Sequence, residues 1–469
     1  MPQATSLAFK DNARRAMADK PLQEALGLAK FGWQRQRTAA AARLPEFEQL
    51  RDEAKAIKDH VLAHLDAYLE AFEQRVVEGG GQVHWARDAA EACRIVVGLC
   101  EASHARLVTK SKSMVAEEIG LNEALEGAGL ERVETDLGEY IIQLAGDTPS
   151  HIVGPALHMT KAQVADLFAK HHGTPRQDEA QALVAEARRV LRQRYLQADV
   201  GITGANYLIA DTGSVVLVTN EGNAELTHGL PGSHIVVASI EKVLPTLEDA
   251  CTLLRVLARS ATGQDFSAYT TLVTGPRREG DLDGPANFHV VLVDNGRAKL
   301  VGTEYREVLR CIRCGACMNH CPVYLATGGH AYGWVYPGPI GAVLTPALIG
   351  IEQGRHLPNA STVCGRCEAV CPVRIPLPKL MRYWREEEFK RRLPPPAARF
   401  GLRLWAFAAQ RPALYHLGAR LAIALLGRFG RRRGGFRFLP LAGGWTGTRD
   451  MPAPEGRTFQ AEWAKRRRQ

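Results

Sequence analysis

The sequence predicts an α/β protein that is followed by a mainly α-helical, ferredoxin-like module and a basic tail. β-Branched runs alternate with helical stretches through the middle of the 469-residue chain, which is typical of an open, mostly parallel sheet covered by helices. Seven of the ten cysteines lie between residues 311 and 371. Basic residues dominate the chain after residue 390. These three features predict the order of the parts.

A helical arm is predicted for residues 1–64. From Phe47 to Phe72 apolar side chains recur at steps of three and four residues, which places them on one face of a helix. Pro45 suits the first turn of that helix, because its missing N–H is not needed there. The three glycines at residues 79–81 are expected to end the helical segment.

Residues 65–300 are predicted to form the α/β domain. Helices are expected at residues 88–104, 114–128, 178–198 and 246–260, with Asp88 placed to cap the first of them. Strands or short apolar runs are expected at residues 82–85, 107–108, 133–136, 141–144, 200–204, 215–218, 235–238, 269–274 and 289–294. Their alternation with helices predicts one mostly parallel sheet.

Two cysteine runs mark residues 301–390 as a metal-binding module. The first reads Cys-x2-Cys-x2-Cys-x3-Cys-Pro, and the second reads Cys-x2-Cys-x3-Cys-Pro. Thiolate sulfur is a soft ligand that holds iron–sulfur clusters, and in two-cluster ferredoxins the cysteine before proline ligates the cluster of the other run. We therefore expect two [4Fe–4S] clusters. The ligands would be Cys311, Cys314, Cys317 and Cys371 for the first cluster, and Cys321, Cys364 and Cys367 for the second.

The second cluster is expected to lack one cysteine ligand. Two cubane clusters need eight ligands, and Ser361 stands where the second run would have its first cysteine. Ser361 could ligate through oxygen, water or hydroxide could occupy an open iron, a partner could supply a thiolate, or the second cluster could be [3Fe–4S]. Cys251 is a fifth and weaker alternative. The residues alone leave this choice open.

Other uses of the cysteines are disfavoured. Both runs contain Cys-x2-Cys-x3-Cys-Pro, and zinc ribbons do not use this spacing twice. A disulfide framework is not needed by a chain of this length, and residues 1–20 lack the apolar core of a secretory signal. The protein is therefore expected in the reducing cytoplasm. Its basic C-terminal tail also suggests peripheral contact with the inner face of the membrane.

Residues 391–469 are predicted to form the basic tail. From residue 390 onward the chain contains 18 Lys and Arg but only 3 acidic residues, whereas the rest of the chain has 41 basic and 47 acidic residues. An amphipathic helix is expected around residues 404–429, and an apolar face flanked by arginines is typical of docking on an acidic partner or anionic lipid. The basic clusters at 431–433 and 465–468 could instead be a solvated end. Nucleic acid is not an expected partner, because the basic tail contains no recognised DNA- or RNA-binding motif.

Polar loops of the α/β domain supply candidates for binding a small anion. Hydroxyl, amide and glycine residues flank the expected strand at 215–218, where backbone N–H groups suit a phosphate or carboxylate. The candidates are Lys110, Lys112, Thr212, Ser214, Asn220 and Glu221. The competing interpretation is that these residues form ordinary turns, and no catalytic residue is assigned. His330 is a candidate proton carrier near the clusters, because histidine titrates near neutral pH.

Several collinear motifs resemble the lactate-utilisation protein B family, the iron–sulfur subunit of a bacterial L-lactate oxidation system. They include residues 110–114, 134–139, 201–206, 219–223, 259–264, 311–317 and 329–333. The resemblance implies a lactate-utilisation domain over about residues 65–300, similar to sugar-phosphate isomerase and coenzyme-A-transferase folds. It also implies two [4Fe–4S] centres on the seven cysteines and suggests that a serine at Ser361 is usual for the family.

The expected function is that of an electron-transfer subunit in the oxidation of L-lactate to pyruvate, with other subunits of that system as partners. No Gly-x-Gly-x-x-Gly flavin fingerprint follows a strand, so whether this chain is itself an enzyme is left open. The alternative is an autonomous α/β enzyme that acts on a small anion with the clusters as accessories. An iron–sulfur regulator that binds DNA is a third, weaker alternative.

Overall fold

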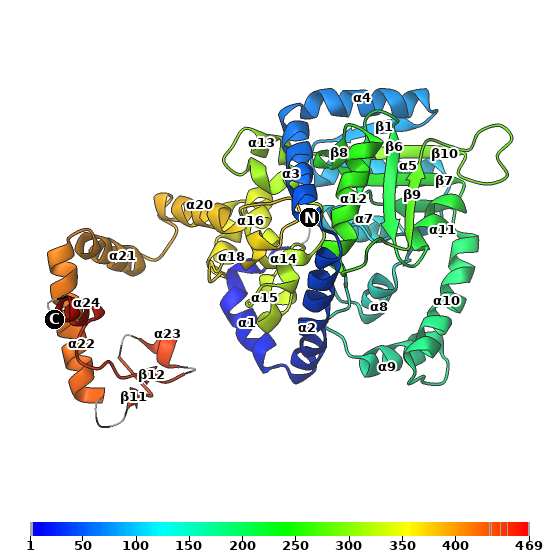
Figure 1. The fold of residues 1–469 in the computed structure, drawn as a ribbon. Coiled ribbons are helices and arrows are strands. Elements are labelled where there is room, and N and C mark those ends of the chain that lie inside the picture. The colour runs from blue at the N-terminus through cyan, green and yellow to red at the C-terminus, as the bar shows by residue number, and fades with distance from the viewer. Residues whose placement is uncertain (1–2, 431, 433, 441, 448, 468–469) are drawn as a thin grey trace. The chain divides into compact units, whose positions relative to one another are not determined.

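Figure 1 shows the fold of the computed structural model, which describes residues 3–467 except for 431, 433, 441 and 448. The chain divides into two compact units, residues 1–387 and 388–469. The first unit contains N-terminal helices, an α/β region and a mostly helical cysteine-bearing region. The predicted α/β class is therefore confirmed, with differences in the sheet that are described below.

The N-terminal arm is helical, as predicted. Its main helices are α1 (Phe9–Ala18), α2 (Lys20–Ala42), α3 (Phe47–Ala63) and α4 (Leu65–Glu78). The apolar pattern from Phe47 to Phe72 spans two helices rather than one, because His64 leaves the helical region with φ −133° and ψ 37°. The arm is not an isolated extension. Thr5 N–H donates to the Gly333 carbonyl at 2.8 Å, and α1 and α2 pack against helices of the cysteine-bearing region.

A six-stranded parallel sheet forms the centre of the α/β region. The strand order is β1 (Gln82–Ala86), β10 (Asn287–Val293), β7 (Ser233–Ser239), β4 (Val200–Thr203), β2 (Leu107–Lys110) and β3 (Glu131–Glu134). Every neighbouring pair is parallel. The central strands β4 and β7 are buried along their whole length, which explains their continuous apolar and β-branched sequences.

A second, four-stranded sheet was not predicted. Its order is β8 (Val243–Leu244), β5 (Tyr207–Ile209), β6 (Ser214–Thr219) and β9 (Tyr269–Val273). The runs at 215–218 and 269–274 belong to this sheet, where β6 pairs antiparallel with both β5 and β9. The prediction of one mostly parallel sheet was wrong here. Gly213, with φ +68°, lets the chain reverse between β5 and β6, and such a turn joins antiparallel neighbours.

The helices predicted in the α/β region are present, one of them broken in two, but the helices at residues 137–145, 161–172 and 223–229 were not predicted. The helices of this region are α5 (Ala89–Ala102), α6 (Met114–Ile119), α7 (Leu121–Gly127), α8 (Leu137–Ala145), α9 (Lys161–His172), α10 (Ala180–Gln197), α11 (Asn223–Gly229) and α12 (Leu247–Ala261). Asp88 caps α5 by accepting from Glu91 N–H at 2.9 Å. The helix expected at 114–128 is broken at Gly120 (φ +73°). The apolar run at 141–144 is helical within α8.

Short helices build the cysteine-bearing region, as predicted for a mainly α module. They are α13 (Arg297–Val301), α14 (Ala316–Asn319), α15 (Tyr324–Thr327), α16 (Gly338–Ile349), α17 (Ile351–Gly354), α18 (His356–Asn359), α19 (Arg366–Ala369) and α20 (Leu377–Lys390), with 3-10 turns at Arg306–Arg310 and His330–Tyr332. Helix α16 is buried through most of its length. It provides an apolar support for the polar and cysteine-rich loops around it.

The C-terminal unit contains two long helices instead of the single one expected. These are α21 (Pro396–Ala409) and α22 (Pro412–Gly430), and Pro412 begins a new helix. The small elements β11 (Gly435–Phe436), α23 (Gly443–Thr446), β12 (Met451–Pro452) and α24 (Phe459–Arg466) follow. Of the predicted basic clusters, Arg431, Arg433 and Arg468 lie outside the described residues. None of the described helices combines the length and apolarity needed to cross a bilayer.

Candidate functional site

Four cysteines from distant parts of the sequence line one cavity. They are Cys311, Cys314, Cys317 and Cys371, and apolar side chains such as Ile312 and Ile340 complete the walls. The last of these cysteines comes from the second run. Burial, and then the charge of Cys371, raise the pKa of the Cys314 thiol. Four thiols around one cavity, two of them buried, are well suited to iron, because a bound metal ion stabilises thiolates.

The other three cysteines form a second group. Burial raises the pKa of the Cys367 thiol to about 12, and repulsion from Cys321 and Cys364 adds to the rise. Each run thus sends its Cys-Pro cysteine toward the other group. Cys364 is exposed, whereas Cys321 and Cys367 are buried. The second group therefore lies nearer to solvent than the first cavity with its buried Cys314.

Backbone N–H groups point at the cysteine sulfurs. Arg313 N–H donates to Cys311 Sγ at 3.4 Å, and Ile375 N–H donates to Cys371 Sγ at 3.4 Å. In the second group Tyr324 N–H donates to Cys321 Sγ at 3.5 Å. Hydrogen bonds of this kind stabilise thiolates and raise the reduction potential of iron–sulfur clusters. The donor set and its hydrogen bonds therefore fit two iron–sulfur clusters.

A buried ion-pair chain connects the first cysteine run to the α/β region. Arg297 forms a two-point pair with Glu118, at 2.6 and 2.8 Å, and its Nε lies 2.9 Å from Glu241. Glu241 in turn pairs with Arg313 at 3.2 Å. Arg313 also lies over the ring of Tyr336, whose hydroxyl donates to Glu118 at 2.6 Å. The chain of contacts closes on itself, and it holds the residue next to Cys314 in place.

The charges of this network are stabilised by one another. Arg297 and Glu118 have fully buried side chains, and Glu241 is 1% exposed. Burial alone would raise the pKa of Glu241, but Arg297 and Arg313 outweigh it and lower the pKa to about 2. The carboxylate therefore stays ionised inside the protein. The Glu241 carbonyl also accepts from Lys58 of α3, so that the network reaches the N-terminal arm.

A second cavity, of about 250 Å³, shares a wall with the first cysteine run. Residues that follow β2, β3, β4 and β7 line it, so it lies at the carboxyl ends of parallel strands, the usual place of ligand sites in such sheets. Ile312, Arg313 and Cys314 form the wall toward the cysteines. The polar lining includes Ser111, Lys112, Ser113, Asp136, Asn206, Asn220, Glu221, Asn223, Lys242, Thr262 and Gln264.

Lys242 is the most distinctive residue of this second cavity. Its side chain is only 6% exposed, and among the described residues its ammonium group has no hydrogen-bond or ion-pair partner. Burial and the charge of Arg313 lower the pKa of Lys242 to about 7. On the opposite side, burial and the nearby Asp136 raise the pKa of Glu221. A buried cation without a partner is suited to an anionic ligand.

The structure brings three of the six candidate anion-binding residues to this cavity. Lys112, Asn220 and Glu221 line it, whereas Lys110, Thr212 and Ser214 do not. Lys110 is fully buried among three carboxylates, those of Glu117, Glu134 and Glu139. Thr212 and Ser214 hydrogen-bond to each other at 2.8 Å in the turn before β6, at the end of that strand opposite Asn220.

Sequence reasoning missed Lys242 and Arg313. Lys242 follows the buried strand β7, so its position at the carboxyl end of a parallel strand was a usable signal. Arg313 lies between two cysteines of the first run, and its position beside Cys314 was the available signal. Nothing in the local sequence indicates that these two residues share a cavity wall, because that depends on the packing of the two regions.

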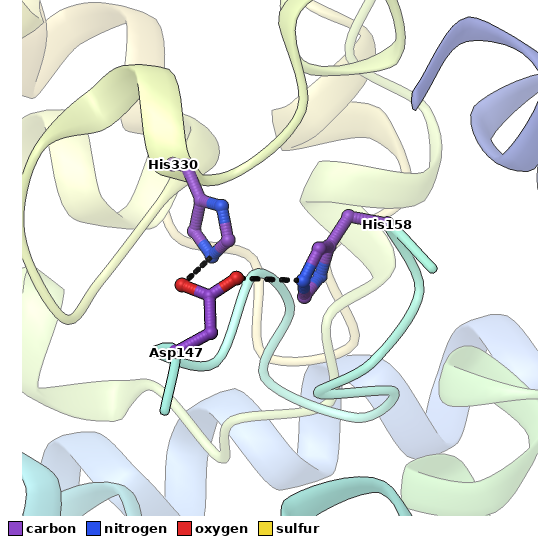
Figure 2. A group of neighbouring side chains, drawn as sticks. All are labelled: Asp147, His158 and His330. Atoms are coloured by element: carbon purple, nitrogen blue, oxygen red, sulfur yellow. Dashed lines mark hydrogen bonds and ion pairs between the residues drawn. The ribbon is translucent and has the colours of Figure 1, made fainter. Parts of the chain in front are cut away.

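His330 belongs to a surface group with Asp147 and His158, which Figure 2 shows with the carboxylate between the two rings. Asp147 Oδ2 lies 3.2 Å from His158 Nε2, and the hydrogen bond from His158 lowers the pKa of Asp147 to about 2. His330 Nε2 donates to the Thr148 carbonyl at 2.7 Å. Because both Nε2 atoms serve as donors within the protein, the group has the geometry of a hydrogen-bonded cluster rather than of a metal site.

Three family models match successive parts of the chain. Residues 69–293 match the LUD domain family, residues 307–375 match a 4Fe-4S dicluster domain, and residues 383–469 match the C-terminal region of lactate utilisation protein B. All seven cysteines of the two runs fall inside the dicluster match.

Full-length relatives decide the family. "Lactate utilization protein B" of Shouchella clausii is 42% identical over 460 residues, covering 98% of this chain and 97% of that protein. The chain belongs to the lactate utilisation protein B family. Family members also include "Lactate utilization protein B" of Oceanobacillus iheyensis, 42% identical over 98% of this chain and 96% of that protein. The resemblance stated from the sequence motifs is thus confirmed.

Two further proteins are similar to this chain. The "Uncharacterized electron transport protein YkgF" of Escherichia coli K12 is 42% identical over 98% of this chain and 96% of that protein. A crystal structure of a DUF162 family protein from Deinococcus radiodurans covers 49% of this chain and 98% of that one, at 16% identity and a TM-score of 0.26. A TM-score this low carries no argument about the fold.

The buried ion network leads to a prediction about stability. Replacing Arg297 by Met should lower the free energy of unfolding by about 3–5 kcal/mol, because Glu118 and Glu241 would remain buried without their partner. Denaturant unfolding of the full chain under anaerobic conditions measures this. The matched control is Arg75→Met, which removes an exposed pair with Glu78 and should change stability little. Equal effects of the two substitutions would contradict the role assigned to the network.

Proposed function

We propose that this protein is an iron–sulfur electron-transfer component of a system that oxidises L-lactate to pyruvate. One observation carries the proposal: seven cysteines from two distant runs gather into two groups, in a region that matches a dicluster domain. Relatives across the whole chain are named for lactate utilization and for electron transport. Electron transfer in lactate use is the function that fits both facts.

The chain's own residues would hold the clusters and shield them. Bound iron–sulfur clusters supply one-electron transfer. Cys311, Cys314, Cys317 and Cys371 would hold the first cluster, and Cys321, Cys364 and Cys367 the second. Tyr332, which is 1% exposed and lies close to Cys321, would shield the second cluster from water. Because Cys364 is exposed, the second cluster would be the one that exchanges electrons with a partner.

The cavity beside Cys314 supports a second candidate function, the binding of a small organic anion by this chain itself. Its volume of about 250 Å³ is slightly below the usual range for drug-sized ligands, and thus suits a small metabolite. Lys242 would bind the carboxylate, while Asn220 and Gln264, which hydrogen-bond to each other at 3.1 Å, form a polar wall. A ligand in this cavity would lie next to the first cluster, as expected for an autonomous enzyme with a small anionic substrate.

The C-terminal unit would serve as a docking element. Large apolar side chains of α21 and α22 are exposed, including Trp405 at 63% and Leu417 at 57%. Arginines interleave with them, for example Arg403 and Arg420. An apolar face with flanking arginines suits the surface of an anionic membrane. The protein would then work in the cytoplasm, at the inner face of the membrane, together with other subunits of the lactate-oxidising system.

Iron analysis tests the electron-transfer proposal. Anaerobically purified protein should contain about eight irons per chain and give the electron paramagnetic resonance signals of reduced [4Fe–4S] clusters. Cys317→Ala should remove roughly half of that iron, because it takes a ligand from the first group. The control Cys251→Ala changes an exposed cysteine on α12 and should leave the iron content unchanged. Zinc in place of iron, or equal behaviour of the two variants, would refute the proposal.

Ligand titration tests the anion-binding function. Calorimetry on cluster-loaded protein should detect L-lactate or pyruvate, and Lys242→Met should weaken binding about 10-fold or more, because a charge-assisted hydrogen bond is lost. Lys299→Met, an exposed lysine on α13, is the control. Reduction of a dye by lactate without other subunits would favour the autonomous enzyme. If neither acid binds, or if Lys242→Met binds as tightly as the parent, this candidate function is wrong.

Vesicle binding tests the docking element. The full chain should sediment with vesicles that contain anionic lipid, more weakly at high salt because screening reduces the attraction of arginines. Leu417→Glu combined with Leu421→Glu should abolish sedimentation, since both leucines are 57% exposed on α22. Leu282→Glu, a fully exposed leucine in the first unit, should have no effect. Equal sedimentation of all three proteins would count against membrane docking.

A further inference from the structure

The two cysteine runs repeat the same backbone with a constant offset of 50 residues. Gly315 has φ 73° and ψ −5°, and Gly365 has φ 80° and ψ −9°. Each glycine precedes a four-residue helix, α14 (Ala316–Asn319) or α19 (Arg366–Ala369). The helices end alike, since Cys321 N–H donates to the Met318 carbonyl at 3.0 Å and Cys371 N–H donates to the Glu368 carbonyl at 3.1 Å.

The residues before these glycines match as well. Arg313 and Val363 both adopt positive φ angles, 60° and 55°. A β-branched residue rarely adopts this conformation, so Val363 is held in it by the surrounding structure. The repeat therefore pairs Cys314 with Cys364. By the same offset it pairs Cys311, the first ligand of the first run, with Ser361.

Ser361 reproduces the local hydrogen bond of Cys311. Arg313 N–H donates to Cys311 Sγ at 3.4 Å. Val363 N–H donates to Ser361 Oγ at 3.1 Å, again from two residues further along the chain. The serine side chain thus occupies the place, and has the backbone donor, of a cluster ligand. A backbone donor of this kind stabilises a deprotonated ligand atom, whether it is sulfur or oxygen.

We propose that Ser361 Oγ is the fourth protein ligand of the second cluster. This inference rests on the proposed function, since it requires a cluster at Cys321, Cys364 and Cys367. Of the remaining cysteines, Cys93 and Cys100 lie in α5, packed in or against the core of the α/β region, and Cys251 is exposed on α12. The carbonyl of Ser361 accepts from Arg385 at 2.9 Å, which anchors the loop that carries the ligand.

Oxygen ligation would give the two clusters different properties. A serine oxygen is a harder ligand than a thiolate and holds iron of the cluster less firmly. Ser361 is also partly exposed, whereas Cys314 is buried. On one-electron oxidation by an external oxidant such as ferricyanide, which takes up the electron, the iron next to Ser361 would therefore be the first to leave, as Fe²⁺. The second cluster would become [3Fe–4S] while the first stays intact.

Three variants of the full chain, purified anaerobically, test the assignment. Ser361→Ala should lose about one iron per chain and give a [3Fe–4S] resonance signal after mild ferricyanide treatment. Ser361→Cys should keep about eight irons, resist ferricyanide longer and show a changed spectrum of the reduced second cluster, because sulfur replaces oxygen at one iron. Thr362→Ala, an adjacent exposed hydroxyl, is the matched control and should behave like the parent.

Two results would overturn the assignment. The first is a parent protein and Ser361→Ala variant with equal iron content and identical spectra. The second, which does not need the alanine variant to load its clusters, is a Ser361→Cys variant whose reduced spectrum and ferricyanide sensitivity equal those of the parent. In both cases the clusters are present, so the proposed function would survive. Protein without iron would instead refute both proposals.

Discussion

The arrangement of both cavities depends on the buried contacts of Arg297 with Glu118 and Glu241. Charges with fully buried side chains are tolerated only when they are paired and hydrogen-bonded. The three partners come from α6, from the turn after β7 and from α13, so that their pairing fixes these elements relative to one another. Through Glu241 the same network holds Arg313. The position of the first cysteine run on the α/β region is thereby set by electrostatics as well as by apolar packing.

That placement has a functional consequence. Arg313 and Cys314 are at once part of the cysteine site and part of the wall of the 250 Å³ cavity. The first cysteine group, which includes the buried Cys314 and Cys371, borders the cavity through Cys314, whereas Cys364 of the second group is exposed. In the proposed function, this order would let electrons pass from the first cluster to the second and on to a partner at the surface.

The near-repeat of the cysteine runs shows how a symmetric scaffold can carry unequal sites. The backbone of both runs is the same within a few degrees at Gly315 and Gly365, so a single change from Cys to Ser alters the chemistry without altering the fold. Lys110, which the sequence suggested as an anion-binding residue, instead lies among three carboxylates, where it stabilises the α/β core.

The family, the iron–sulfur chemistry and several of the longer helices follow from the sequence by itself. Cysteine spacing, helix caps such as Asp88 and apolar periodicity each depend on residues close together in the sequence. They can therefore be predicted from the sequence of one segment. Only the tertiary structure decided that the strands form six-stranded and four-stranded sheets, that the N-terminal helices cover the cysteine-bearing region, and that Lys242 shares a cavity wall with Cys314. These features arise from contacts between residues far apart in sequence, and no pattern within one segment encodes its partner.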